Sequence, residues 1–267
     1  MAKLLALLAA TAFSNTIRDP TVSVVGGNDV SSAQDYPFML LNKPCFAIGC
    51  VQCGASLIAP TMALSAAHCF YLGRLPATRV TLYQNLLTLN SQYSCKSSAS
   101  SINDCEYQEM PAENIFPHED YDDSTSRNDI AVIRLNREFT YAPSSYPSLP
   151  TVPPSEGDDH RVTGWGTTTE GGVTSNILQY ADIPVLSQNT CASQVPIFTR
   201  DMQYCAAYAR GGVDSCQGDS GGPFFKQDRN GVVMYGIVSY GYGCAQAGNP
   251  GVYTSVYNFR DWVLGKM

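Results

Sequence analysis

The sequence has 267 residues, of which 44% are hydrophobic and 15% are charged, and its formal net charge is −7. This length suits one large domain or two smaller ones that share an interface. An acidic chain without a basic stripe does not suit nucleic-acid binding, and no run approaches the roughly 20 apolar residues of a membrane-spanning helix.

The N-terminus has the features of a secretory signal peptide. Lys3 precedes an apolar stretch from Leu4 to Ala10, and Ala10-Thr11-Ala12 is similar to a cleavage site. Ten cysteines at irregular spacing, without paired C-x2-C motifs beside histidines, indicate disulfides rather than metal sites. Because disulfides persist in oxidising compartments, we expect a secreted, extracellular protein. Residues 1–12 are the predicted signal peptide, with the cleavage position left open.

Short apolar or alternating runs follow along the chain, separated by Gly, Pro, Asn and Ser. They cover residues 79–83, 129–135, 177–186 and 232–240. Such runs are typical of an all-β sandwich or barrel. A proline-rich stretch at 141–154 is typical of a connector between two halves. Val256, Phe259 and Val263 fall at helical spacing, which predicts a short helix near the C-terminus.

Three motifs place a base, a carboxylate and a nucleophile along the chain. They are Ala66-Ala67-His68-Cys69, Asn128-Asp129-Ile130-Ala131 and Gly218-Asp219-Ser220-Gly221-Gly222-Pro223. A serine hydroxyl is a poor nucleophile unless a neighbouring base takes its proton. His68, Asp129 and Ser220 are therefore the candidate catalytic residues. The alternative interpretation of His68 is a histidine with an ordinary role in the core.

The order of these residues decides between two classes of hydrolase. The segment around Ser220 also matches G-x-S-x-G, the nucleophile elbow of α/β-hydrolases, which need their histidine after the serine. All three histidines, His68, His118 and His160, precede Ser220. The elbow is therefore excluded, and the order His, Asp, Ser is that of chymotrypsin-like proteases.

Over residues 24–267 the chain resembles a trypsin-like serine protease of the chymotrypsin family. Besides the three motifs, the likeness rests on Val24-Val25-Gly26-Gly27, Gly164-Trp165-Gly166, Asp214-Ser215-Cys216-Gln217, Gly236-Ile237-Val238-Ser239-Tyr240-Gly241 and Pro250-Gly251-Val252-Tyr253-Thr254. The resemblance implies two six-stranded antiparallel β-barrels, at about 24–140 and about 155–255, and a C-terminal helix at about 256–267. It also implies a monomeric serine endopeptidase that needs no cofactor.

The resemblance assigns a role to each catalytic candidate. Ser220 would attack the scissile carbonyl, His68 would take its proton, and Asp129 would orient His68, so that an acyl-enzyme forms. The backbone N–H groups of Gly218 and Ser220 would form the oxyanion hole. Ser239 would support Asp129 and the substrate backbone, although it could equally be an ordinary strand serine.

The resemblance places Asp214 at the base of the primary specificity pocket. Gly241 and Gly251 would keep this pocket open, and Ser215 and Tyr253 would line it. A deep slot ending in a carboxylate favours protein or peptide substrates with Arg or Lys before the scissile bond. The alternative is a solvated loop aspartate, and a preference between Arg and Lys is left open.

The resemblance also implies a zymogen with residues 13–23 as a propeptide. Cleavage before Val24 would free an ammonium that pairs with Asp219 and orders the site. Without that partner the buried carboxylate is costly, so we expect the site to be poorly formed in the uncut chain. Ser23 stands where a trypsin-like enzyme would need Lys or Arg. We therefore expect a different, unidentified protease to activate the chain.

The cysteines divide into two groups. The resemblance pairs Cys53 with Cys69, Cys191 with Cys205, and Cys216 with Cys244. Four others lie outside the common pattern: Cys45, Cys50, Cys95 and Cys105. Pairing Cys45 with Cys50 and Cys95 with Cys105 is the most local of three possible connectivities, which stay open.

Three further interpretations complete the analysis. Tyr240 stands where the family usually has tryptophan, which predicts an altered preference at a neighbouring subsite. The acidic residues Glu119, Asp120, Asp122 and Asp123 are interpreted as a solvated loop rather than a calcium site, and no metal is expected. The alternative function is a catalytically silent homologue that binds partners. The physiological substrate and biological role are left open.

Overall fold

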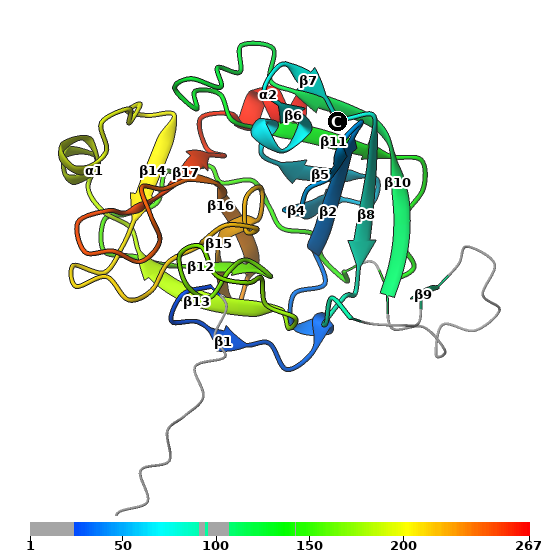
Figure 1. The fold of residues 1–267 in the computed structure, drawn as a ribbon, viewed down its shortest axis with the longest axis horizontal. Coiled ribbons are helices and arrows are strands. Elements are labelled where there is room, and N and C mark those ends of the chain that lie inside the picture. The colour runs from blue at the N-terminus through cyan, green and yellow to red at the C-terminus, as the bar shows by residue number, and fades with distance from the viewer. Residues whose placement is uncertain (1–23, 91–93, 96–106, 142) are drawn as a thin grey trace, which may run out of the picture.

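The computed structural model of the chain describes residues 24–90, 94–95, 107–141 and 143–267 (Figure 1). The predicted signal peptide (1–12) and propeptide (13–23) lie outside these residues, as does Cys105. The described chain is almost entirely β-structure. None of its helices is long and apolar enough to cross a membrane.

The first barrel is a closed ring of six antiparallel strands. They are β2 (Met39–Phe46), β4 (Cys53–Ala59), β5 (Met62–Ser65), β8 (Arg79–Gln84), β10 (Tyr107–Pro117) and β11 (Ala131–Leu135). Their order is β11-β5-β4-β2-β8-β10, and β10 pairs with β11 to close the ring. Closure leaves no open edge among these strands. Alternate residues of β8 point into the core, as expected for a barrel wall.

The second barrel contains six strands in the order β13-β12-β15-β16-β17-β14. They are β12 (Asp159–Gly164), β13 (Gln179–Pro184), β14 (Gln203–Ala206), β15 (Pro223–Asp228), β16 (Gly231–Tyr240) and β17 (Gly251–Ser255). The two ends of this sheet meet at a single antiparallel bridge between Val185 and Ala206. The predicted all-β fold of two six-stranded antiparallel barrels is thus confirmed.

Short elements decorate the barrels. The strands are β1 (Asn28–Asp29), which pairs with β13; β3 (Gly49–Cys50), which pairs with β2; β6 (Tyr71–Leu72), which pairs with β7 (Leu75–Pro76); and β9 (Ser94–Cys95), which pairs with β10. The helices are η1 (Ala33–Asp35), η2 (Ala67–Phe70), α1 (Gln188–Gln194) and α2 (Arg260–Leu264). The sequence analysis did not anticipate α1, which begins where the Ser187 hydroxyl accepts the N–H of Thr190.

One cluster of buried hydrophobic side chains extends across both barrels. Phe38, which precedes β2, meets Phe225 of β15 edge to face, with ring centroids 5.1 Å apart. Trp165 and Ile237 of the second half belong to the same cluster of buried side chains. Because this core is continuous, the packing of one barrel fixes the position of the other.

Each end of the described chain packs on the barrel that is distant in sequence. Val24, at the start of the range expected for the first barrel, is fully buried in the core of the second. At the other end, Trp262 of α2 donates a hydrogen bond to Glu119 beside the first barrel. Both ends therefore hold the two barrels together.

Four disulfides lie in the described chain: Cys45–Cys50, Cys53–Cys69, Cys191–Cys205 and Cys216–Cys244. The first joins directly opposed residues of β2 and β3. The expected local partner of Cys95 is Cys105, which lies outside the described residues.

Candidate active site

The side chain of Asp129 links the two barrels at the centre of the site. Its Oδ2 lies 2.8 Å from His68 Nδ1, and its Oδ1 accepts the backbone N–H of His68 at 2.9 Å. Ser239 of β16 donates its hydroxyl to Asp129 Oδ2 at 2.5 Å. The carboxylate is 1% exposed, whereas the His68 side chain is 28% exposed and can meet a ligand.

Local structure explains why Asp129 and His68 meet. His68 lies on η2, which the Cys53–Cys69 disulfide ties to β4. Asp129 precedes β11 and follows Asn128, whose φ of 55° is a left-handed conformation that asparagine tolerates well. Thr254 of β17 donates to the Asp129 carbonyl at 2.8 Å. The sequence analysis gave Thr254 no role, although Thr254 ends one of the motifs, because its contact with Asp129 arises only in the folded chain.

The contact between Asp129 and His68 lowers the pKa of Asp129 and raises the pKa of His68. Burial alone would raise the pKa of Asp129, but the charge of His68 and hydrogen bonds from His68 and Ser239 bring this pKa below its ordinary value. Burial alone would lower the pKa of His68, but Asp129, and more weakly Asp123, bring this pKa above 6.5. The site therefore holds a carboxylate that stays charged and a histidine that binds its proton more tightly than an ordinary histidine does.

Ser220 lies on a tight turn between β14 and β15. Gly218 and Gly221 adopt φ angles of 99° and 80°, which side chains rarely allow. A Cβ on Gly221 would lie 2.3 Å from Ser65 Oγ, so this turn also needs glycine to approach the first barrel. The Ser220 carbonyl accepts the N–H of Gly54 in β4 at 2.7 Å, which docks the turn on the other barrel.

The Ser220 turn and His68 approach each other around one disulfide sulfur. Cys69 Sγ lies 3.9 Å from His68 Nε2 and 3.6 Å from the Ser220 carbonyl oxygen. Both residues are described, and no hydrogen bond joins the Ser220 hydroxyl to the His68 ring. Such bonds often tighten only when substrate is bound.

Two backbone N–H groups of this turn remain available. Within the described chain, neither Gly218 nor Ser220 donates its N–H to a protein acceptor, whereas Asp219 and Gly221 donate theirs to Cys216 and Val238. Free donors on one rigid turn can bind a developing oxyanion.

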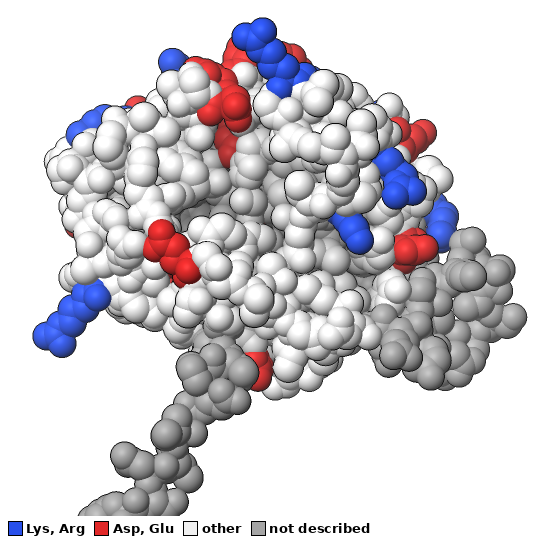
Figure 2. Space-filling view, viewed as in Figure 1, with Lys and Arg blue, Asp and Glu red and all other residues white. Residues whose placement is uncertain are grey.

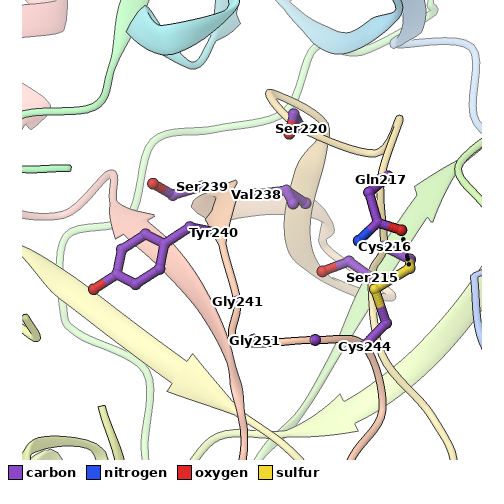
Figure 3. Close-up of a pocket in the computed structure, with 11 residues that line it drawn as sticks. Ser215, Cys216, Gln217, Ser220, Val238, Ser239, Tyr240, Gly241, Cys244 and Gly251 are labelled. Carbon is purple, nitrogen blue, oxygen red and sulfur yellow. Dashed lines mark hydrogen bonds between the residues drawn. A yellow bond between two sulfur atoms is a disulfide. The ribbon is translucent and has the colours of Figure 1, made fainter. Parts of the chain in front are cut away.

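A cavity of about 180 Å³ opens beside Ser220 (Figure 3). It is lined by Ser215, Cys216, Gln217, Ser220, Val238, Ser239, Tyr240, Gly241, Gly243, Cys244 and Gly251. The list includes four residues proposed from sequence for substrate binding, namely Ser215, Ser239, Gly241 and Gly251. The Cys216–Cys244 disulfide forms one wall, and the Tyr240 ring extends away from Ser220 on the other side.

Asp214 lies directly behind this lining rather than within it. A Cβ on Gly251 would meet Asp214 Oδ1 at 2.5 Å, so only glycine lets the cavity reach this carboxylate. Asp214 is 3% exposed; its Oδ2 accepts the N–H of Ala245, and its buried Oδ1 has no hydrogen-bond partner. Burial raises the pKa of Asp214 to about 7. A buried, half-satisfied carboxylate behind a slot suits a cationic ligand group.

Tyr253 differs from its expected place. It was expected to line the pocket, but it is fully buried and does not belong to the lining. The hydroxyls of Tyr253 and Ser215 lie 3.3 Å apart. Tyr253 therefore supports a lining residue from behind.

Asp219 is fully buried, with an exposed fraction of 1%. Its carboxylate accepts the N–H groups of Gly166 at 2.8 Å and Cys216 at 3.0 Å, and burial raises its pKa to about 6. Val24 is buried with a φ of 51°, and Val25 forms a bridge with Asp214. The site was expected to be poorly formed in the uncut chain. The two N–H donors hold Asp219 and the adjoining turn, and the effect of cleavage on the site stays a prediction.

The described residues offer one cluster with metal-ligand chemistry, formed by Cys53, His68 and Cys69. Both cysteines are bonded to each other, so they provide no thiolates and the cluster does not fit a metal. Figure 2 shows acidic side chains along the upper edge of the face, above its central hollow. In the loop between β10 and β11, Asp122 is engaged by hydroxyls of Ser124 and Thr125.

Comparisons with known proteins agree on one family. A profile of the family described as Trypsin matches residues 24–263. Trypsin-1 of Astacus astacus is 36% identical over 245 residues, which cover 90% of this chain and 98% of the relative. Trypsin-1 of Salmo salar is 35% identical over 245 residues, covering 91% and 90%. The Suppressor of tumorigenicity 14 protein homolog of Bos taurus is 39% identical over 221 residues, covering 80% of this chain but 25% of the relative.

Proposed function

This chain belongs to the trypsin family and is a serine endopeptidase, and we propose that it cleaves proteins or peptides after Arg or Lys through Ser220, His68 and Asp129. The observation that carries this proposal is the Asp129 carboxylate, which accepts hydrogen bonds from both the ring and the backbone of His68. With Nδ1 engaged by Asp129, the other ring nitrogen of His68 is left to act as the base.

The reaction follows from these positions. The Ser220 hydroxyl attacks the scissile carbonyl while His68 Nε2 takes its proton, and Asp129 stabilises the imidazolium that forms. The free N–H groups of Gly218 and Ser220 bind the oxyanion, and loss of one such donor typically costs about 2.7–4 kcal/mol of transition-state stabilisation. His68 then protonates the leaving amine. Water hydrolyses the acyl-enzyme, with His68 again acting as the base.

The preference for Arg or Lys rests on Asp214. The cavity ends at Gly251, and the unpaired Oδ1 of Asp214 lies immediately behind it. A long cationic side chain would satisfy that oxygen, while a neutral side chain would leave it buried without a partner. Ser215 at the lining could accept a hydrogen bond from a lysine ammonium.

We also propose that the protein is secreted as a monomeric zymogen. The four disulfides of the described chain and the apolar N-terminal stretch support secretion. Cleavage before Val24 would give Asp219 an ammonium partner. Because Ser23 precedes that bond, we expect purified precursor incubated alone not to yield a Val24 terminus. N-terminal sequencing that found such a terminus would contradict the need for another protease.

The central experiment combines active-site labelling with substrate profiling. A serine-directed phosphonate should modify Ser220 of the matured protein, and a peptide panel varied only before the scissile bond should be cut after Arg and Lys. Because His68 must be neutral, activity should fall on acidification through a pKa above 6.5. Ser220→Ala is the matched control and should neither react nor cleave. Absence of a Ser220 adduct in the wild-type protein would refute the mechanism.

A further inference from the structure

A buried glutamine connects three segments beside the active site. Gln203 begins β14 and is 1% exposed. Its Nε2 donates to the Ser126 carbonyl at 3.1 Å, and its Oε1 accepts the Thr199 N–H at 2.8 Å. The Tyr240 hydroxyl donates to the same Oε1 at 3.3 Å. The amide thus joins a first-barrel loop, the loop after α1, and the end of β16.

The contact with Ser126 acts on the segment that delivers Asp129. Ser126 lies three residues before Asp129, and both Ser126 and Asn128 have left-handed backbones, with φ of 51° and 55°. Such conformations persist only where the surroundings hold them. The side chain of Asn128 anchors the segment by donating to the Asp120 carbonyl at 2.7 Å. Gln203 supplies a second anchor, from the other barrel.

The contact with Tyr240 acts on the wall of the substrate cavity. Tyr240 directly follows Ser239, the residue that donates to Asp129. Its ring is half-buried at the cavity and extends away from Ser220 (Figure 3). A tyrosine hydroxyl fixed by a buried acceptor holds the ring in one orientation. The hydroxyl is the feature that distinguishes Tyr240 from a purely apolar aromatic wall.

The backbone of Gln203 reinforces the same connection. Gln203 is the register partner of Thr254 in β17, and the Thr254 hydroxyl donates to the Asp129 carbonyl at 2.8 Å. The segment around Asp129 is therefore held by Gln203 directly and by its strand neighbour. Replacing the amide would leave the carbonyl of Ser126 and the N–H of Thr199, two partly buried residues, without this partner, which weakens their hold on the loops.

We propose that Gln203 is a positioning residue that couples the orientation of Asp129, through Ser126, to the placement of Tyr240 against substrate residues upstream of the scissile bond. The proposal rests on the proposed function for its kinetic consequences. The geometric part, which concerns Asp129 and its partner His68, can be tested without catalysis.

Gln203→Met preserves side-chain length and removes all three hydrogen bonds. Its matched control is Gln84→Met, because Gln84 is also fully buried and its Nε2 donates to two carbonyls, those of Pro37 and Tyr141. Tyr240→Phe removes only the hydroxyl and keeps Gln203 in place. All variants are assayed per titrated active site on a blocked single-arginine amide and on a tetrapeptide amide with the same leaving group.

For Gln203→Met we expect kcat to fall on both substrates. For the tetrapeptide, kcat/KM should fall by an additional factor of about three to ten, which is the scale of one neutral hydrogen bond. Tyr240→Phe should raise KM for the tetrapeptide by about threefold and change the kinetics of the single-arginine amide by less, so that the ratio of kcat/KM between the two substrates falls. An unchanged ratio between the two substrates in Tyr240→Phe would overturn the proposal, even if Gln203→Met did not fold.

Proton NMR titration of His68 in the full chain provides the test that is independent of activity. Asp129 and Asp123 are the charged groups that raise the pKa of His68. A displaced Asp129 should therefore lower this pKa in Gln203→Met but not in Gln84→Met. Equal titration in the two variants would overturn the proposal. If the wild-type protein cleaved neither substrate while the His68 shift appeared, the proposed function would fail and the positioning role would stand.

Discussion

Three aspartates are buried in the described chain, and their partners give them different titrations. Asp129 faces His68 and Ser239, and its pKa is lowered. Asp214 and Asp219 have backbone donors but no cation, and burial raises their pKa values to about 7 and about 6. An aspartate side chain is thus charged throughout the neutral pH range at position 129. At positions 214 and 219 it loses its proton only at higher pH or beside a cation.

The raised pKa of Asp214 predicts how a cationic ligand binds. Butylguanidinium, which reproduces the arginine side chain, should bind the charged carboxylate. Below pH 7 a proton must leave first, so the Kd should rise by up to about tenfold per pH unit. Calorimetry between pH 5.5 and 8.5 measures this slope. Asp214→Ser should lose the steep dependence, and with it the preference for Arg and Lys in the peptide panel. A steep slope retained in that variant would contradict the assignment.

Local sequence motifs predicted some residues of the candidate site but not those whose contacts arise only in the folded chain. The sequence analysis proposed His68, Asp129, Ser220 and Asp214 because each lies in a short recognisable segment. Thr254 and Gln203 were not proposed, because their contacts with the Asp129 segment arise from pairing between β14 and β17 and from docking of the two barrels. The sequence analysis placed Tyr253 in the lining of the pocket, whereas it lies buried behind the lining. A sequence does not show whether a residue lies at the surface of a pocket or behind it.

At the scale of elements, the apolar and alternating runs predicted an all-β sandwich or barrel, and the family resemblance was needed to choose two barrels. Neither could settle the partner of Cys45, because that pairing depends on the register of β2 and β3, where Cys45 lies opposite Cys50. Helix α1 has only seven residues, too few to show a helical period, and its main signal is the Ser187 cap. Short elements are therefore the part of this fold that sequence describes least well.

Removal of a disulfide should lower stability, and it should also lower activity where the disulfide holds an element of the candidate site. Cys53–Cys69 closes a separation of 16 residues and holds η2, whereas Cys45–Cys50 closes a separation of five in a peripheral hairpin. Loop entropy predicts losses of about 3 and about 2 kcal/mol of unfolding free energy when each pair is replaced by alanines. Only the first replacement should also lower kcat, because His68 lies on η2. Urea unfolding measures the losses of stability, and kinetics per titrated active site measure kcat. Equal losses of kcat in the two variants would contradict this prediction.

At the scale of the whole molecule, the two barrels are joined by a shared core and by both ends of the described chain. Val24 enters the core of the second barrel, and after cleavage its ammonium is proposed to pair with Asp219. The stability of the whole fold should therefore respond to the charge on this one enclosed carboxylate.

The uncut chain should lose stability as the pH rises. The pKa of Asp219 is raised from 3.8 to about 6 in the folded state, so the folded chain holds this proton more tightly than the unfolded one. Between pH 4 and 7 this contribution should fall by about 2.4 kcal/mol. The difference in unfolding free energy between wild type and Asp219→Asn, measured at each pH, separates the contribution of Asp219 from that of the histidines. A difference that stays constant with pH would refute it, and cleavage before Val24 should abolish the slope.

The contacts of Asp129 with Ser239 and Thr254 have a consequence for the timing of synthesis. A ribosome delivers His68 and Asp129 early, but it delivers the two strands that secure this carboxylate only near the end of the message. A nascent chain therefore cannot secure Asp129 until β16 and β17 have emerged. The proposed proton relay should be among the last parts of the fold to form, before the cleavage that is proposed to activate it.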